Sequence, residues 1–275
     1  MREVFESSVA FITGGASGIG RALGVELARR GAEVVLADRQ HQSASEVAAE
    51  ICGSGGKAHA LELDVRDHEA FRHAAQSIVE RSGRIDHFFN NAGITVGGLI
   101  ENYRIEDWDE VFDVNLRGVA YGIQAVYPIM IAQGSGHIIN TASVAGIFPG
   151  ALAGSYCASK HGVVGLSRTL RIEAKRHGVR VSVLCPGAVD TPILRGGKYG
   201  RSTGTEGWDK HRSMEPDVFA RKALDAVGKN QLTILLPKWY NAVWWLDRVA
   251  PRLTLRMCEA QLNRDLTNVR PAELR

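Results

Sequence analysis

Residues 8–30 read SVAFITGGASGIGRALGVELARR, and this stretch decides the fold. Its first part, residues 8–13, is a short apolar run that ends at glycines, which predicts a buried parallel strand. Its last part, residues 21–30, carries apolar side chains at helical spacing. A strand, a glycine turn and a helix in this order aim backbone N–H groups and the helix dipole at a phosphate. The stretch therefore predicts a site for the phosphates of a nucleotide.

The glycine turn has the spacing G-x-x-x-G-x-G, formed by Gly14, Gly18 and Gly20. This differs from the G-x-G-x-x-G of the common dinucleotide fingerprint. Glycines let the chain turn tightly and let a pyrophosphate approach the backbone, and we expect Ser17 and Ile19 to take part in the same contact. A glycine-rich surface loop is the alternative, and the flanking strand and helix argue against it.

The rest of the chain alternates between apolar runs and helical patterns. We predict strands at 33–37, 58–63, 85–89, 137–141, 179–184 and 232–236, and helices at 43–52, 67–81, 105–130, 155–177 and 216–227, with Asp67 as an N-cap. Strands separated by helices are typical of a right-handed, doubly wound sheet. The expected fold is α/β, a Rossmann-type doubly wound parallel sheet of about seven strands flanked by helices. We expect residues 1–237 to form a single catalytic domain with the cofactor and substrate sites together, and 238–275 to form a C-terminal helical extension packed on it.

An acidic residue, Asp38, follows the second predicted strand, about 20 residues past the glycines, where a ribose 2′-hydroxyl is bound. A carboxylate at this place also repels a 2′-phosphate, which favours NAD(H) over NADP(H). Ser17, just before Gly18, is not basic, which removes one source of phosphate recognition, whereas Arg39 could bind the phosphate instead. We expect NAD(H) to be preferred, with NADP(H) as the other candidate.

Composition excludes several classes of protein. The 275 residues are 45% hydrophobic, enough to build the core of one large α/β domain or two small ones. The net charge of +3 is spread along the chain, so no nucleic-acid-binding surface is expected. Four scattered cysteines and nine histidines without ligand spacing predict neither a disulfide framework nor a metal site. No signal peptide and no apolar window of the ~18 residues that a membrane span needs is recognisable, so we expect a cytoplasmic protein.

A second informative segment is SVAGIFPGALAGSYCASK, residues 143–160. Tyr156 and Lys160 are four residues apart, which places them on one face of the predicted helix. A phenol titrates near ~10, and an ammonium within a few ångströms favours the phenolate and lowers that pKa towards neutral pH. Ser143 follows an apolar strand and could fix a substrate oxygen beside the tyrosine. Alone, however, Y-x-x-x-K is more often an exposed helical pair.

Three further positions carry chemistry. Asp64 follows the third predicted strand, where a carboxylate could accept from an adenine amino group. Asn115 lies inside a predicted helix, where Asn is mildly unfavourable. It is either a surface residue, or a side chain or distorted turn placed for water-mediated proton exchange. Pro186 and Gly187 follow the sixth strand, at the carboxyl edge where ligands bind in such sheets.

Together these motifs resemble the short-chain dehydrogenase/reductase (SDR) family over residues 8–237. The matching motifs are T-G-x-x-x-G-x-G from Thr13, Asp64, N-N-A-G at 90–93, Asn115, Ser143, Y-x-x-x-K at 156–160 and P-G-x-x-x-T at 186–191. The resemblance implies an NAD(P)-dependent oxidoreductase that interconverts a secondary alcohol and a ketone or aldehyde by hydride transfer. Two alternatives stay open: an NADPH-dependent carbonyl reductase and, outside the enzymes, a dinucleotide-sensing binding protein.

The resemblance also implies roles for individual residues. Tyr156 would be the general acid/base, Lys160 would lower its pKa and bind the nicotinamide ribose, and Ser143 would orient the carbonyl or alkoxide. Asn115 would hold a proton-relay water. The expected cofactor contacts are Gly14, Ser17, Gly18, Ile19, Gly20, Asp38, Arg39, Asp64, Val65, Asn91, Ala92, Gly93, Tyr156, Lys160, Pro186, Gly187, Val189 and Thr191. Of these, Val189 and Thr191 would contact the nicotinamide amide.

Side chains near these motifs suggest a lipophilic alcohol or carbonyl substrate. The candidates are largely apolar: Ile94, Val96, Ala145, Ile147, Phe148, Ala151, Leu152 and Leu194. Core packing explains several of them equally well. The glycine-rich polar segment 195–213 is predicted to be a mobile lid over the substrate, with a plain surface loop as the alternative.

The Trp-rich segment KWYNAVWWLDRVA, residues 238–250, precedes Pro251 and a second helical pattern. It could pack at a subunit interface or over the substrate entrance, lie on a membrane surface, or cap the core of its own subunit. We do not favour membrane contact, and Pro251 excludes a continuous membrane span. The family resemblance implies a homodimer or homotetramer.

Overall fold

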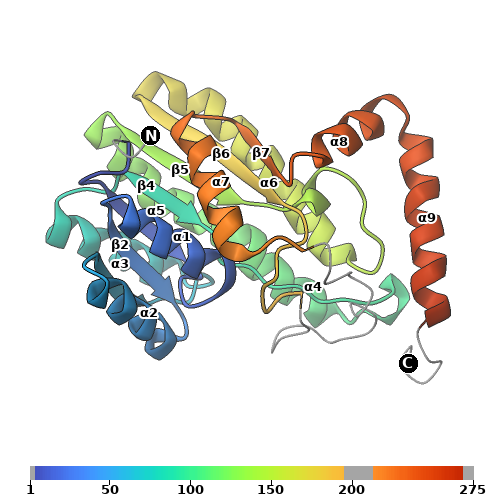
Figure 1. The fold of residues 1–275 in the computed structure, drawn as a ribbon, viewed down its shortest axis with the longest axis horizontal. Helices are drawn as coiled ribbons and strands as arrows, with labels where there is room; N and C mark the ends of the chain where they lie inside the picture. Colours follow the sequence, from blue (N-terminus) through green and yellow to red (C-terminus); the bar gives the residue numbers. More distant parts are fainter. Residues whose placement is uncertain (1–3, 195–212, 269–275) are drawn as a thin grey trace.

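The structure, a computed structural model, describes residues 4–194 and 213–268 (Figure 1). Its seven strands form one parallel sheet in the order β3-β2-β1-β4-β5-β6-β7. The order reverses between β1 and β4, as the predicted doubly wound arrangement requires. The strands are β1 Val9–Thr13, β2 Glu33–Asp38, β3 Lys57–Glu62, β4 His87–Asn90, β5 Gly136–Thr141, β6 Val179–Pro186 and β7 Thr233–Leu236.

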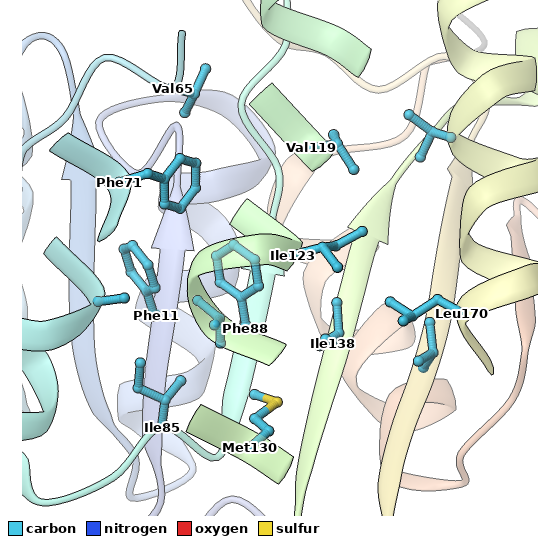
Figure 2. Packing of buried hydrophobic residues seen from close by; sticks show 14 of the residues in the cluster. Phe11, Val65, Phe71, Ile85, Phe88, Val119, Ile123, Met130, Ile138 and Leu170 are labelled. Atoms are coloured by element: carbon cyan, nitrogen blue, oxygen red, sulfur yellow. The ribbon is translucent and has the colours of Figure 1, made fainter. Parts of the chain in front are cut away.

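Helices cover both faces of the sheet, and each face has its own hydrophobic core. The helices are α1 Gly18–Arg29, α2 His41–Gly53, α3 His68–Ser82, α4 Ile105–Phe112, α5 Gly118–Gln133, α6 Gly154–Ala174, α7 Pro216–Gly228, α8 Tyr240–Val249 and α9 Pro251–Asn268. One core packs α3, α5 and α6 on the sheet, with Phe11, Phe71 and Phe88 in ring contact near its centre (Figure 2). The other packs α1, α2 and α7 on the opposite face. The chain thus buries both faces of the sheet, which is why strands such as β1 and β2 consist mainly of apolar residues.

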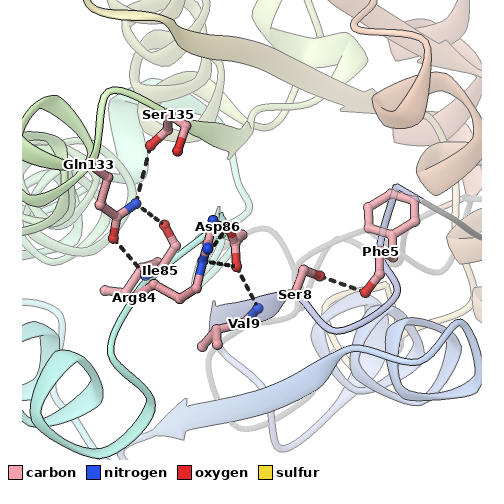
Figure 3. Close-up of polar contacts among 8 residues, drawn as sticks. All are labelled: Phe5, Ser8, Val9, Arg84, Ile85, Asp86, Gln133 and Ser135. Carbon is pink, nitrogen blue, oxygen red and sulfur yellow. Dashed lines mark hydrogen bonds and ion pairs between the residues drawn. The ribbon is translucent and has the colours of Figure 1, made fainter.

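Polar contacts join the amino ends of the strands (Figure 3). The Val9 N–H donates to the Asp86 carboxylate at 2.9 Å, and Arg84 pairs with the same carboxylate. The side-chain amide of Gln133 accepts from the Ile85 N–H and donates to the Ile85 carbonyl at 3.0 and 2.9 Å. These bonds tie together the amino ends of β1 and β4 and the end of α5.

The predicted helix 105–130 is present, but it is not a regular α-helix throughout. A π turn, Asp113–Arg117, separates α4 from α5, and α5 runs on to Gln133. The other predicted elements are present with ends that differ by a few residues. The N-cap prediction is confirmed, because the Asp67 side chain accepts from the Ala70 N–H at 2.9 Å.

The C-terminal helices α8 and α9 follow the last strand, and α9 stands at the margin of the molecule, away from the sheet (Figure 1). Tyr240 and Trp244 of α8 pack against the core beneath α6, whereas Trp245 is 66% exposed. Within residues 4–194 and 213–268, no helix has the length and apolar character needed to cross a membrane. The division at residue 237 stays a prediction, and most of the predicted lid, residues 195–212, lies outside the described residues.

Candidate active site

A cavity of about 430 Å³ lies at the carboxyl edge of the sheet. Loops after the first six strands and the start of α6 form its walls. Most of the predicted cofactor residues line it: Gly14, Ser17, Gly18, Ile19, Asp38, Arg39, Asp64, Val65, Asn91, Ala92, Gly93, Tyr156, Lys160, Pro186 and Thr191. The sequence thus predicted the site from motifs that lie far apart along the chain.

The glycine turn forms one end of the cavity. Gly14 and Gly18 have φ of +68° and +52°, a region that side chains disfavour, so glycine is needed at both positions. Ser17 is the N-cap residue of α1, but its side chain makes no capping hydrogen bond. The first N–H groups of α1 are therefore not capped by that hydroxyl, which suits an anion in the cavity.

Three predicted cofactor residues do not line the cavity, and each has a packing role instead. A Cβ on Gly20 would lie 2.0 Å from the Gly14 carbonyl oxygen, so Gly20 allows α1 to start directly behind the turn. A Cβ on Gly187 would lie 2.1 Å from the ring of Tyr240. Val189 is buried in the core beneath α1, α2 and α7. For these three residues, a contact with the cofactor stays a prediction, and it could involve only their backbone atoms.

Asp38 organises the next part of the cavity. Its carboxylate accepts from the Ala16 N–H at 3.1 Å and from the Gln40 N–H at 3.0 Å, which ties the end of β2 to the glycine turn. Arg39 lines the cavity beside it. The negative charge that the sequence predicted to select the cofactor is thus held on the cavity wall by two backbone bonds.

Asp64 forms an ion pair with Arg66, a residue that was not among those predicted from the sequence. Arg66 forms an ion pair with it at 2.5 Å, and hydrogen bonds from this guanidinium lower the pKa of the Asp64 carboxyl. Both residues line the cavity. Asp64 stays charged there, but it shares its oxygens with Arg66, so its predicted contact with an adenine amino group stays a prediction.

The residues 90–93 connect two neighbouring strands at the cavity. The N–H groups of Asn91 and Ala92 both donate to the Thr13 hydroxyl at 3.0 Å, and the Asn91 side chain donates to the Thr13 carbonyl. A Cβ on Gly93 would lie 3.3 Å from both the Lys160 ammonium and the Asn115 side-chain oxygen. The missing side chain of Gly93 therefore leaves room for the side chains of Lys160 and Asn115.

Tyr156 and Lys160 of α6 lie at the other end of the cavity. The Lys160 ammonium sits over the Tyr156 ring, 5.6 Å from its centroid, and donates to the Thr141 carbonyl at 2.9 Å. The Ser143 hydroxyl is buried and hydrogen-bonds to Tyr156, donates to the Pro186 carbonyl at 3.4 Å and accepts from the Ala145 N–H at 3.1 Å. The structure therefore brings the predicted serine, tyrosine and lysine together.

Burial controls the protonation of this group. It raises the pKa of Tyr156 to about 12, against the opposing effect of the hydrogen bond with Ser143. It lowers the pKa of Lys160 to about 8, because an ammonium loses its hydration inside the protein. In this structure Tyr156 is protonated at neutral pH, and the lowering of its pKa by Lys160 stays a prediction.

Asn115 lies in the π turn and is fully buried, so the surface interpretation is wrong. Its side chain accepts from the Ile94 N–H at 2.8 Å and donates to the Ile94 carbonyl at 2.9 Å and to the Ser159 hydroxyl at 3.2 Å. These bonds join the loop after β4 to α6. The side chain is thus occupied by protein partners, and the distorted turn that the sequence reading proposed as one option is present.

Only one of the predicted substrate residues, Ile94, lines the cavity. Val96 packs with Ile94 and Val111 in a small separate core, and Phe148 stacks on Tyr240 with ring centroids 5.9 Å apart. Ala145, Ile147, Ala151, Leu152 and Leu194 are likewise outside the cavity lining. Their apolar character therefore reflects packing at least as much as substrate contact.

The sequence reading missed part of the cavity wall. The additional lining residues are Ala16, Gln40, Ser43, Leu63, Arg66, Thr95, Val114, Thr141, Ala142, Pro192 and Ile193. Most of them are direct neighbours of predicted residues, so the positions next to each motif were the signal available. Val114 is the exception, because only the π turn brings it to the cavity.

The cavity fits a nicotinamide dinucleotide. The uncapped start of α1 suits the pyrophosphate, the Asp38 carboxylate suits a ribose hydroxyl, and the close approach at Gly93 leaves the Lys160 ammonium accessible from the cavity. Within the described parts of the chain, no group of three or more His, Cys, Asp or Glu residues could hold a metal ion. Binding of an organic cofactor is therefore what this arrangement of residues suits.

Comparisons with known proteins agree with this description. A family model described as short chain dehydrogenase matches residues 8–198. The C alpha-dehydrogenase of Sphingobium sp. is 34% identical over 270 residues, covering 90% of this chain and 88% of the relative. A short-chain dehydrogenase/reductase from Burkholderia phymatum, solved in complex with NAD, superposes with a TM-score of 0.83 at 30% identity and covers 91% of this chain and 96% of that one.

A metagenomic short-chain oxidoreductase solved with NADP superposes with a TM-score of 0.71 at 32% identity, covering 84% of this chain and 98% of that one. Relatives of known structure thus bind either NAD or NADP. The family match, the sheet order and the catalytic group agree with one another. The chain belongs to the short-chain dehydrogenase/reductase family and is an oxidoreductase that acts on alcohol or carbonyl groups.

Proposed function

We propose that this protein interconverts a lipophilic secondary alcohol and the corresponding ketone or aldehyde, with NAD(H) preferred. One observation carries the proposal: a single cavity is lined by the Asp38 carboxylate and the glycine turn and also by Tyr156 and Lys160, with the buried Ser143 beside Tyr156. This provides a place for the adenosine and phosphates and a place for the reacting groups.

The residues would divide the chemistry as follows. A bound nicotinamide supplies or accepts the hydride. Tyr156 exchanges the proton with the substrate oxygen, donating it in reduction and taking it in oxidation. The Ser143 hydroxyl donates a hydrogen bond to the same oxygen, and Lys160 binds the nicotinamide ribose and favours the Tyr156 phenolate. Asn115 holds the π turn in place, and the turn's backbone carbonyls are candidates to hold a relay water.

Cofactor contacts are proposed for the predicted residues that line the cavity. Thr191 would contact the nicotinamide amide, and the backbone of Pro186, Gly187 and Val189 would support it. At the other end, Gly14, Ser17, Gly18 and Ile19 would surround the pyrophosphate, while Val65 and Asp64 would lie beside the adenine.

The substrate is proposed to be lipophilic because the cavity near Tyr156 is mainly apolar, with Ile94, Val114, Ala142 and Ile193 in its wall. Its charged side chains other than Lys160 are Asp38, Arg39, Asp64 and Arg66, and all four belong to the loops that follow β2 and β3. The catalytic end therefore has no described cation besides Lys160 for an acidic substrate. The name of the Sphingobium relative, C alpha-dehydrogenase, agrees with chemistry at an alcohol carbon.

An NADPH-dependent carbonyl reductase is the second candidate. Arg39 and Arg66 both line the cavity near Asp38, and a guanidinium is a good partner for a 2′-phosphate. The two cofactors are therefore distinguished by whether the charge of Asp38 or that of its basic neighbours prevails.

The experiment that tests the proposal measures thermal stability with NAD(H) and NADP(H) at matched concentrations, followed by turnover of a panel of apolar secondary alcohols and ketones. A ligand that binds only the folded state raises the melting temperature more the further its concentration exceeds its Kd. A larger shift with NAD(H) and turnover of an apolar alcohol or ketone are expected. A larger shift with NADP(H) would identify the carbonyl reductase instead, and no turnover across the panel would contradict the proposed substrate class.

Two further expectations belong to the proposal. We propose a homodimer or homotetramer by family likeness, with α8 and α9 as surfaces for a neighbouring subunit or for the substrate entrance. A cytoplasmic location is consistent with four cysteines that are all free thiols.

A further inference from the structure

The C-terminal extension reaches the loops around Ser143 through Tyr240 of α8, which packs against Gly187 and Phe148, and through Cys258 of α9, whose thiol donates to the Pro149 carbonyl at 3.4 Å. Most of the apolar surface of α8 and α9 faces solvent, including Trp245 at 66% and Val249 at 57% exposure. Tyr240, the first residue of α8, is half-buried instead and packs against the main core. This side chain enters the body of the protein at the loop that follows β6.

The ring of Tyr240 explains why residue 187 is a glycine. Gly187 is not among the glycines with positive φ, so its backbone conformation does not require a missing side chain. A Cβ at this position would, however, lie 2.1 Å from Cε2 and 2.8 Å from Cζ of Tyr240. The ring therefore rests directly on the backbone of Gly187.

Two other contacts fix the ring in this place. Burial raises the pKa of Tyr240, and the backbone of Ala188 opposes this effect, which indicates that the phenol lies near the residue after Gly187. Phe148 stacks against the ring with centroids 5.9 Å apart and planes inclined by 23°. Tyr240 thus lies between the loop after β6 and the loop that follows Ser143.

These two loops hold the catalytic serine. The Ser143 hydroxyl donates to the carbonyl of Pro186, the residue before Gly187, and hydrogen-bonds to Tyr156. Pro186 also lines the cavity. A shift of the Pro186–Ala188 backbone would therefore move the acceptor that orients the Ser143 hydroxyl.

We propose that Tyr240 is a positioning residue for catalysis: its ring holds the Pro186–Ala188 backbone so that Ser143 is oriented towards the substrate oxygen. The C-terminal extension is then part of the catalytic apparatus. This inference rests on the proposed function of Ser143.

The test compares kcat, KM and the cofactor-induced melting shift in four variants. Tyr240→Leu is expected to lower kcat roughly 10- to 100-fold, because a displacement of about 1 Å costs about that much, while the melting shift with cofactor is unchanged. Tyr240→Phe keeps the ring against Gly187 and should retain most of the kcat. Trp245→Leu, which removes an exposed aromatic ring from the same helix, should leave kcat unchanged. If Tyr240→Leu does not fold, Gly187→Ala tests the same contact by displacing the ring.

A double-mutant cycle with Ser143→Ala separates positioning from a general structural effect. In the Ser143→Ala background Tyr240→Leu should cause no further loss of kcat, because residues that act as a unit are not additive. Losses that multiply, or full activity in Tyr240→Leu alone, would overturn the role of Tyr240. Unchanged turnover in Ser143→Ala alone would contradict the proposed function of the serine instead, and the role of Tyr240 with it.

Discussion

The Lys160 ammonium lies 5.6 Å from the centroid of the Tyr156 ring, one helical turn earlier on α6, and donates to the Thr141 carbonyl at the end of β5. This bond fixes the lysine against the sheet, so the helix presents the tyrosine and the lysine to the cavity in a defined relation. Both groups are buried, and burial acts on them in opposite directions, raising the pKa of the phenol to about 12 and lowering that of the ammonium to about 8. The pKa values of the two groups, which nearly coincide in water, are thereby moved apart.

Replacing Lys160 by Met is expected to lower kcat at pH 7 by about 100-fold or more, the usual contribution of a positioned acid/base system. Stability should change little, since the variant removes a buried charge but leaves the Thr141 carbonyl without its donor. The measurement is kcat against pH, with urea unfolding as the check on folding. Lys222→Met on the exposed face of α7 is the control. Unchanged activity and an unchanged pH profile would contradict the role given to Lys160.

Replacing Asp38 by Asn is expected to shift the preference towards NADP(H) by about tenfold or more, because a like charge opposite a 2′-phosphate costs more than 1.4 kcal/mol. The amide oxygen can still accept from the Ala16 N–H, while the bond from the Gln40 N–H is lost. Kd values for both cofactors provide the measurement. Glu62→Gln is a matched control, since Glu62 is paired with Asp38 in the sheet register but does not line the cavity. The same shift in both variants would mean that general charge, and not Asp38, selects the cofactor.

The stability of the protein should fall on acidification because of a buried histidine. Burial lowers the pKa of His87 to about 4, and neither of its ring nitrogens has a hydrogen-bond partner. Between pH 6.5 and about 4 the unfolded chain binds the proton and the native chain does not, so stability is present above this window and is lost as the pH falls through it. Between pH 7 and 5 this group alone should cost about 2 kcal/mol.

Urea unfolding at pH 7 and pH 5 measures this loss. His87→Leu should show a smaller loss between the two pH values than the unmodified protein, whereas replacing the exposed His73 by Ala should not change it. Equal losses in the protein and in His87→Leu would assign the acid sensitivity to other groups, of which the buried His137, whose pKa is also lowered by burial, is the next candidate.

Gly20→Ala is expected to destabilise the protein by roughly 1–3 kcal/mol, the usual cost of forcing extra volume into a packed site. The added methyl group would lie 2.0 Å from the Gly14 carbonyl oxygen. Cofactor binding should weaken with it, because the turn must move. Gly53→Ala at the end of α2, where a Cβ would meet nothing within 4 Å, should cause no loss. Equal stability of the two variants in urea would show that the turn relaxes without cost.

The fold was predictable from the sequence because its signals are local and repeated. A strand that is buried on both faces of a sheet has to be apolar along its length. Residues 9–13 form such a strand, and their apolar run can be recognised without the structure. The catalytic group was predictable for another reason: Tyr156 and Lys160 lie on one helix, and their spacing alone places them together.

The rest depended on contacts between distant segments. Nothing in the local pattern of residues 105–130 shows a π turn, because it is held by bonds from Asn115 to Ile94 and Ser159. The substrate residues stay a prediction, because apolar side chains such as Val96 and Phe148 serve packing and binding equally well in sequence. The pKa of Tyr156 likewise depends on burial, which is a property of the folded chain.

The π turn at Asp113–Arg117 has a consequence for the length of the chain. A π turn holds one residue more than an α turn in the same hydrogen-bonded ring, so it behaves as a single-residue insertion that the helix retains. Removing one residue here would let α4 and α5 fuse into a regular helix and would rotate one half by about 100° against the other. Asn115 would then leave Ile94, and Val114 would leave the cavity. Related chains aligned without a gap across this segment can therefore share the active site, whereas one with a deletion there cannot keep it unchanged.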